Sequence, residues 1–148
     1  MDKEDIITYQ RINGLSLEEA ARHVRYAFYN RIAEKQGFDK IALGHHADDN
    51  AELVLMYLIR GSGPRGISGI PWVRDKVIRP LIRVKRSEII GFLDSKGLEY
   101  VCDASNRDTR YLRNRIRHHL IPALKASYNP RITEEEIKQK SQKTLDEA

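Results

Sequence analysis

The sequence is short of cysteine and of long apolar runs, and each shortage excludes a class of protein. Its 148 residues include one cysteine, Cys102, which excludes an internal disulfide and a zinc site built from cysteines. No apolar run approaches the roughly 18 residues of a membrane span. The first five residues are mostly charged and acidic, where a signal peptide would begin with basic residues. We therefore expect a cytoplasmic protein that does not associate with membranes.

Charge, by contrast, is plentiful. Charged residues make up 32% of the sequence and hydrophobic residues 41%, which predicts a globular domain with its own core. The formal net charge of +5 favours a polyanionic partner, although the same excess is common in proteins that never bind nucleic acid. The chain has no internal repeat and no low-complexity tract. Its length fits one domain with a helical appendage.

The densest group of ionisable side chains lies in residues 44–52. This run is Gly44-His45-His46-Ala47-Asp48-Asp49-Asn50-Ala51-Glu52, with two imidazoles and three carboxylates. It follows a predicted buried strand at residues 40–43 and precedes residues 53–59, which are apolar enough to form a helix. A polar turn between a strand and a helix is where α/β proteins usually keep their chemistry. Asp49 and Glu52 also have capping-box spacing, with Asp49 as the N-cap. Capping the helix is compatible with a functional role, because a capped helix start can also offer a metal-ligating carboxylate beneath a phosphate.

Apolar spacing predicts several further elements. Residues 17–36 have helical periodicity, with a capping box at Ser16 and Glu19 and a left-handed stop at Gly37. Residues 1–15 are predicted to be a connection. Extended segments at residues 70–73 and 77–81 flank a predicted turn at Arg74-Asp75, where Trp72 is expected to be a packing residue. A second helix is predicted over residues 87–96, ending at Gly97.

Residues 61–69 form a loop with four glycines and one proline. Such a loop is either a flexible connector or a backbone surface that a substrate approaches closely. Composition alone favours the connector.

A second polar stretch, residues 103–119, is rich in arginine. Apolar residues recur in it at intervals of four and predict a helix with one apolar stripe: Leu112, Ile116, Leu120 and Leu124. Polar residues are expected to share a neighbouring face: Arg110, Arg113, Asn114 and Arg117. A row of guanidiniums is usually just a solvated face. Arginine dominates over lysine here, however, which suits bidentate contacts to phosphate.

Taken together, these stretches resemble the catalytic domain of the bacterial tRNA(Ile)-lysidine synthetases, in the N-type ATP pyrophosphatase (PP-loop) superfamily. The resemblance rests on four motifs in the same order and spans roughly residues 16–125. The motifs are residues 44–52, residues 58–63 with 66–71, Ile78-Arg79-Pro80-Leu81, and Asp103-Ala104-Ser105-Asn106 running into Arg113-Asn114-Arg115-Ile116-Arg117-His118.

The resemblance implies an α/β fold of the partial Rossmann-like, adenine nucleotide alpha hydrolase-like kind. Helices would flank a parallel sheet, and a helical extension would follow at the C-terminus. Residues 1–128 would be the C-terminal part of the catalytic domain. Residues 129–148 would be a linker and the start of a helical segment.

The resemblance also implies a two-step reaction. ATP, with Mg2+, adenylates the C2 oxygen of the wobble cytidine of tRNA(Ile), and the amine of free L-lysine then displaces AMP to give lysidine. By family analogy the catalytic residues are His46, Asp49, Glu52 and Arg113. His46, Asp49 and Glu52 would bind the metal or the substrate amine, with Asp49 and Glu52 as the metal ligands. Asp48 would support them. The nucleotide contacts would be Arg113, Arg117, Gly61 and Gly63, and the residues alone do not decide which of His45 and His46 points inward.

One part of the family pattern is missing from the sequence. Lysidine synthetases open with a Ser-Gly-Gly-x-Asp-Ser loop whose amides hold the ATP phosphates, and the sequence has no such segment. We therefore expect an N-terminally truncated catalytic domain, whose exposed sheet edges would favour self-association.

Two alternatives stay open at this stage. A tRNA thiolation enzyme of the same superfamily would use the same ATP chemistry, but such enzymes generally bring more than one cysteine. A noncatalytic RNA-binding fragment would keep part of the fold without activity, and the missing phosphate loop favours it.

Overall fold

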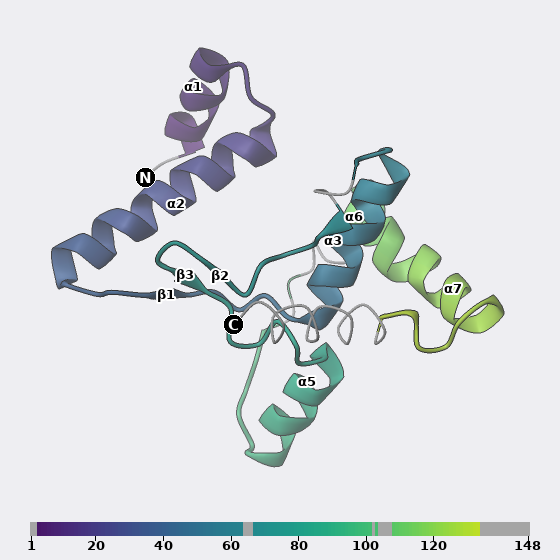
Figure 1. Ribbon diagram of the computed structural model, residues 1–148. Helices are drawn as coiled ribbons and strands as arrows, with labels where there is room; N and C mark the ends of the chain where they lie inside the picture. The colour runs from purple at the N-terminus through teal and green to yellow at the C-terminus, as the bar shows by residue number, and fades with distance from the viewer. Residues whose placement is uncertain (1–2, 64–66, 102, 104–107, 134–148) are drawn as a thin grey trace. The chain divides into compact units, whose positions relative to one another are not determined.

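The computed structural model describes residues 3–63, 67–101, 103 and 108–133, and it has a mixed α/β architecture (Figure 1). The described elements are α1 (Lys3–Asn13), α2 (Leu17–Gln36), β1 (Ile41–Ala42), α3 (Ala47–Ile59), β2 (Val73–Arg74), β3 (Val77–Ile78), α5 (Arg86–Ser95), α6 (Leu112–Arg115), the π-helical turn η2 (Ile116–Leu120) and α7 (Ile121–Ser127). The chain divides into two compact units, residues 1–42 with 75–78 and residues 43–74 with 79–148.

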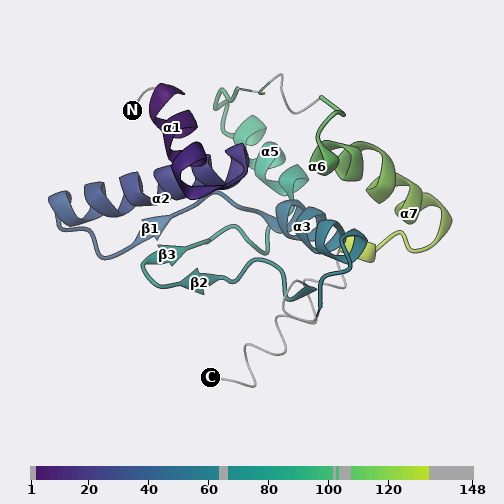
Figure 2. The same ribbon diagram turned by 90° about the horizontal axis from the view of Figure 1, so that it is seen from above.

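The three short strands form one sheet in the order β1-β3-β2. β1 and β3 are parallel, with Ile41 opposite Val77 and Ala42 opposite Ile78 (Figure 2). The Ile41 amide donates to the Lys76 carbonyl at 2.8 Å. The mixed α/β class predicted from the sequence is confirmed, whereas the larger parallel sheet implied by the resemblance stays a prediction.

Helix α2 has the bounds and both caps that the sequence predicts. The Ser16 hydroxyl accepts from the Glu19 amide at 3.2 Å, and the Glu19 carboxylate accepts from the Ser16 amide at 3.0 Å. Gly37 ends the helix with φ 70°, a left-handed conformation that glycine adopts without steric cost. These caps are local interactions, which is why the sequence pattern reveals them.

The prediction of a connection over residues 1–15 is wrong, because Lys3–Asn13 form helix α1. Figure 1 shows α1 folded back against α2, and the Tyr9 and His23 rings meet edge to face with their centroids 6.2 Å apart. An isolated helix of this length is marginal in water, so contact with α2 stabilises it. That contact is tertiary and leaves little trace in the local sequence.

Helix α3 begins three residues earlier than the predicted capping box. His46 is the N-cap and Asp49 the third helical residue, so the prediction that Asp49 is the N-cap is wrong. The Ala47 amide donates to the Val84 carbonyl at 2.9 Å, which holds the helix start from a distant part of the chain. The Asp49 carboxylate then accepts from the His46 amide at 3.0 Å.

The start of α5 is tied to the start of α3. The Arg86 amide donates to the Asp48 carboxylate at 2.8 Å, and the Lys85 amide donates to the Glu88 carboxylate at 2.8 Å. Both carboxylates satisfy amides that a helix N-terminus leaves without an intrahelical partner. Asp48 therefore joins two helix starts 38 residues apart in the sequence.

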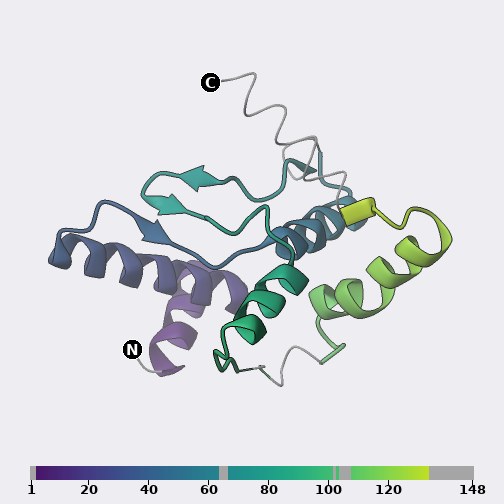
Figure 3. The ribbon, with the colours of Figure 1, turned by 90° about the horizontal axis from the view of Figure 1, so that it is seen from below.

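Helical structure runs through residues 112–127 as α6, η2 and α7, the light-green ribbon of Figure 3. The core of this part consists of Met56, Ile116 and Ile121, with Leu55, Leu112 and Leu120 packed against it. The predicted apolar stripe is therefore right up to Leu120 and wrong beyond it. A π-helical turn takes more than four residues, so Ile121 joins the core where uniform α-helical spacing predicts Leu124.

In the part of the chain that the structure describes, no helix is both long and apolar enough to cross a membrane. Cys102 and most of the helical segment predicted after residue 129 lie outside the described residues. The domain boundary predicted at that position stays a prediction.

Ile116 is 1% exposed and central to the core, so Ile116→Ala should lower the free energy of unfolding by about 2–5 kcal/mol. Val101→Ala, at a side chain that is 97% exposed, should change it by less than about 0.5 kcal/mol. Urea denaturation followed by circular dichroism measures both. Equal effects of the two substitutions would contradict the assigned core.

Candidate functional site

The candidate site forms where α3 meets the helix that begins at Leu112, and its centre is the carboxylate of Glu52. Glu52 is 1% exposed. Its Oε1 accepts from Arg117 Nε at 2.5 Å, and its Oε2 accepts from Arg113 Nε at 2.7 Å and from Arg117 Nη2 at 3.0 Å. Two guanidiniums therefore neutralise one buried carboxylate.

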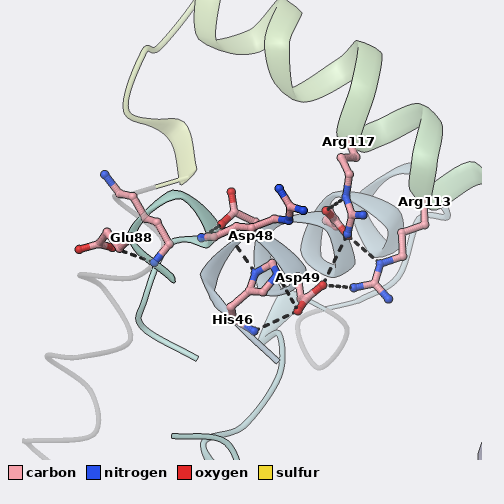
Figure 4. A network of polar contacts seen from close by, with 9 residues as sticks. His46, Asp48, Asp49, Glu88, Arg113 and Arg117 are labelled. Carbon is pink, nitrogen blue, oxygen red and sulfur yellow. Dashed lines mark hydrogen bonds and ion pairs between the residues drawn. The ribbon is translucent and has the colours of Figure 1, made fainter. Parts of the chain in front are cut away.

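Asp49 extends this network toward the start of α3 (Figure 4). Its Oδ1 accepts from Arg113 Nη2 at 2.5 Å and lies 3.6 Å from Arg117 Nη2. Its Oδ2 accepts the His46 amide, so each oxygen has a donor. Arg113 thus bridges Asp49 and Glu52 with two nitrogens of a single guanidinium, a geometry that lysine cannot reproduce.

Helix geometry brings these four side chains together. Residues three or four positions apart lie on one face of a helix, as Asp49 and Glu52 do on α3 and Arg113 and Arg117 do on the later helix. The hydrogen bond from Arg117 to Glu52 is the main cause that raises the pKa of Arg117. Burial opposes this shift, and the charges of Glu52, Asp49 and Asp48 add to it. Arg117 therefore stays protonated.

His46 lies against the carboxylates at the N-terminus of α3. Its Nδ1 is 3.7 Å from an Asp48 oxygen, and its Nε2 is 3.5 Å from an Asp49 oxygen. The side chain is 15% exposed, whereas that of Asp48 is 36% exposed. Of the two histidines that the sequence leaves open, His46 has these carboxylate neighbours.

Arg110 does not share the face of Arg113 and Arg117, so that prediction is wrong. Its Nε and Nη2 donate to the Asp108 carboxylate at 3.0 and 2.7 Å, and its side chain is largely exposed. These hydrogen bonds lower the pKa of Asp108. Asn114, which is buried, donates to the Asp108 carbonyl at 2.8 Å and so shapes the entry to the helix.

Gly61 and Gly63 lie beyond the end of α3, whereas Asp49 and Glu52 meet the arginines in its first half. Gly61 follows the end of α3 with φ 70°, and the Ser62 amide donates to the Tyr57 carbonyl at 2.9 Å. Gly61 is twelve residues beyond Asp49, about 18 Å along a helix. The conformation gives Gly61 a role in ending the helix, and the nucleotide-binding role of both glycines stays a prediction.

The five charged side chains of the site carry a net charge of −1. They are Asp48, Asp49, Glu52, Arg113 and Arg117. This balance suits a cationic group such as an amine better than an unaccompanied triphosphate.

A magnesium ion does not fit Glu52 in this arrangement, because the carboxylate is buried and both oxygens accept from guanidiniums. Among the described residues, no group of three or more His, Cys, Asp or Glu side chains could hold a metal ion. Magnesium is often bound by one or two carboxylates together with substrate phosphates. The metal role predicted for Asp49 and Glu52 would need the arginines to release Glu52, and it stays a prediction.

Sequence reasoning gave no role to Asn50, although this residue lies inside the dense run of residues 44–52. Its side chain is buried, and its Oδ1 accepts from the Ile70 amide at 2.7 Å. Asn50 therefore ties the segment after the glycine loop to α3. A carboxamide at the start of an amphipathic helix could have indicated a buried polar contact. The sequence does not reveal the partner of Asn50, however, because Ile70 lies twenty residues away.

The sequence that forms this fold and site matches a known protein family. The model of the PP-loop domain matches residues 2–124, and the chain therefore belongs to the PP-loop domain family.

The relatives of this chain narrow the comparison. This chain is 45% identical over 128 residues to the tRNA(Ile)-lysidine synthase of Thermotoga sp. (strain RQ2). The match covers 86% of this chain and 31% of the relative. The tRNA(Ile)-lysidine synthase of Geobacillus kaustophilus is 43% identical over 134 residues, and the match covers 88% of this chain and 29% of the relative. The tRNA(Ile)-lysidine synthase of Geobacter sulfurreducens is 49% identical over 112 residues, and the match covers 74% of this chain and 24% of the relative. The chain spans about a quarter to a third of the length of these relatives.

A double-mutant cycle between Glu52 and Arg117 tests the network. Glu52→Ala should lower the free energy of unfolding by about 3–5 kcal/mol, because it leaves two guanidiniums without their buried counterion. In the Glu52→Ala/Arg117→Ala double mutant the loss should be smaller than the sum of the two single losses. Chemical denaturation measures all four proteins, and strict additivity would contradict the contact.

Proposed function

We propose that this chain is part of a tRNA(Ile)-lysidine synthase and contributes to joining L-lysine to C2 of the wobble cytidine of tRNA(Ile) at the expense of ATP. One observation carries the proposal. The two segments that resemble the family's motifs, 61–65 residues apart, meet through Asp49, Glu52, Arg113 and Arg117. The relatives named above support the same reaction.

The carboxylates are suited to the substrate amine. Asp48 and Asp49 lie at the start of α3, and the half-buried Asp48 can accept from the ammonium group of lysine. The amine must lose a proton before it attacks the activated cytidine. His46 lies between these two carboxylates and is the proposed proton acceptor.

The arginines are suited to the phosphates of ATP, with Mg2+ as the proposed counterion. The side chain of Arg113 is 44% exposed, and a guanidinium carries five N–H donors. Its Nε and Nη2 hold the carboxylates, which orients the rest of the group for a phosphate oxygen. Glu52 is therefore proposed to position Arg113 and Arg117, in addition to any direct contact with substrate.

A tRNA thiolation enzyme is less well supported. The relatives named above are lysidine synthases, and thiolation enzymes generally use more cysteines than the single one in this sequence. A noncatalytic RNA-binding fragment predicts RNA binding without lysine transfer, so an activity assay separates it from the proposal.

The assay needs a protein that also supplies the phosphate loop. In the Thermotoga relative, the residues that align with residues 16–125 of this chain can be replaced by that segment. This graft should attach radiolabelled lysine to tRNA(Ile) when ATP is present. Asp49→Ala in the graft should lower the rate by about 100-fold or more, because the site loses an amine ligand and a partner of Arg113.

Asp94→Ala is the matched control, because Asp94 is an exposed acid on α5. Its rate should equal that of the unmodified graft. A folded graft without any lysine transfer, or an Asp49→Ala graft with an unchanged rate, would contradict the proposed function.

A further inference from the structure

Trp72 is the only tryptophan of the chain, and its position differs from the packing role that the sequence predicts. The residue is 46% exposed. The guanidinium of Arg83 lies over the ring, 4.6 Å from its centroid. An indole that is stacked by a cation and still open to solvent is available to a ligand.

The main chain at Trp72 is held by a buried arginine. Arg79 is 2% exposed, and its Nη1 donates to the Pro71 carbonyl at 2.8 Å. The Arg79 amide donates to the Trp72 carbonyl at 2.9 Å. Two hydrogen bonds to consecutive carbonyls restrict the backbone that carries the indole, so a ligand would meet a pre-ordered ring.

The sequence around Trp72 is strongly basic. Residues 72–86 contain six lysines and arginines and one aspartate, a net charge of +5 that equals the net charge of the whole chain. Arg74, Arg83 and Arg86 are exposed. A concentration of positive charge beside an exposed aromatic ring favours a polyanion with flat rings over an apolar protein partner.

The segment with Trp72 is also tied to the candidate site. Ile70, two residues before Trp72, donates its amide to Asn50, the neighbour of Asp49 on α3. Two residues of extended chain span at most about 7 Å. The backbone of Trp72 is therefore anchored close to the start of α3.

We propose that Trp72 and Arg83 form a stacking platform for an unpaired base of RNA. Sequence-tolerant binding of single-stranded RNA uses aromatic rings and guanidinium planes on which bases stack, with basic residues along the backbone. The inference rests on the proposed function in one respect, because tRNA is the RNA that the site would act on. It assigns RNA contact to residues outside the carboxylate and arginine network.

Because Trp72 is the sole tryptophan, its fluorescence reports on the platform directly. An anticodon stem-loop RNA titrated into the 148-residue chain should quench the emission in a saturable way, since a base stacks on the indole. Heparin, a polyanion without bases, should bind without comparable quenching. RNA binding that leaves the emission unchanged would overturn the inference.

Variants measure the contribution of the ring to affinity, read from the anisotropy of labelled RNA. Trp72→Ala should weaken RNA binding about tenfold, and Trp72→Phe should keep most of it. Tyr128→Ala, at an aromatic residue that is 81% exposed, should bind as the unmodified chain does. Equal affinity of Trp72→Ala and the unmodified chain would overturn the inference.

A second pair of variants keeps the test valid if Trp72→Ala fails to fold. Arg83→Gln should weaken binding, whereas Arg22→Gln, which removes a similar cation–π contact over Tyr26, should not. Equal affinities of this pair would also overturn the inference. Failure of the proposed function is separate, since lysine transfer by the graft can be lost while RNA still quenches Trp72.

Discussion

The carboxylate of Glu52 is buried, and a buried charge without partners would be energetically costly. Arg113 and Arg117 supply those partners, and their hydrogen bonds reach both oxygens of the carboxylate. Each guanidinium also lies within ion-pair distance of Asp49. The helix that begins at Leu112 must therefore present both arginines to α3. The other features of the candidate site depend on this requirement.

Apolar packing acts in the same direction as the ion pairs. Ile116 lies between the two arginines in the sequence and packs on Met56 of α3. The helix that begins at Leu112 thus presents both arginines and Ile116 to α3. The π-helical turn that begins at Ile116 then lets Ile121 reach the core as well. Such turns often occur at functional sites, and here the turn includes Arg117.

Local interactions decided how much of the fold could be predicted. The bounds and caps of α2 follow from Ser16, Glu19 and Gly37, which act within a few residues of the helix ends. The start of α3 depends on the carbonyl of Val84, and α1 depends on contact with α2. Neither partner is local in the sequence. The start of α3 was therefore predicted three residues too late, and α1 was predicted to be a connection.

The distinction between local and distant interactions also holds for the candidate site. Motif resemblance selected Asp49, Glu52, Arg113 and Arg117, and the structure brings these four together. Helical spacing also placed Arg110 on a face with Arg113 and Arg117, but Asp108, two residues away, pairs with that guanidinium instead. Exposure of Trp72 and burial of Arg79 could not be predicted, because both depend on how the segment of residues 70–83 folds back on itself.

The pairing of Glu52 with both guanidiniums can be tested by the exchange rate of the arginine Nε protons with water, measured by ¹⁵N NMR on the 148-residue chain. If Glu52 accepts from both guanidiniums, the Nε protons of Arg113 and Arg117 should exchange slowly, and Glu52→Ala should make both exchange rapidly. Rapid exchange of both protons in the unmodified chain, at the rate of exposed arginines, would contradict the account.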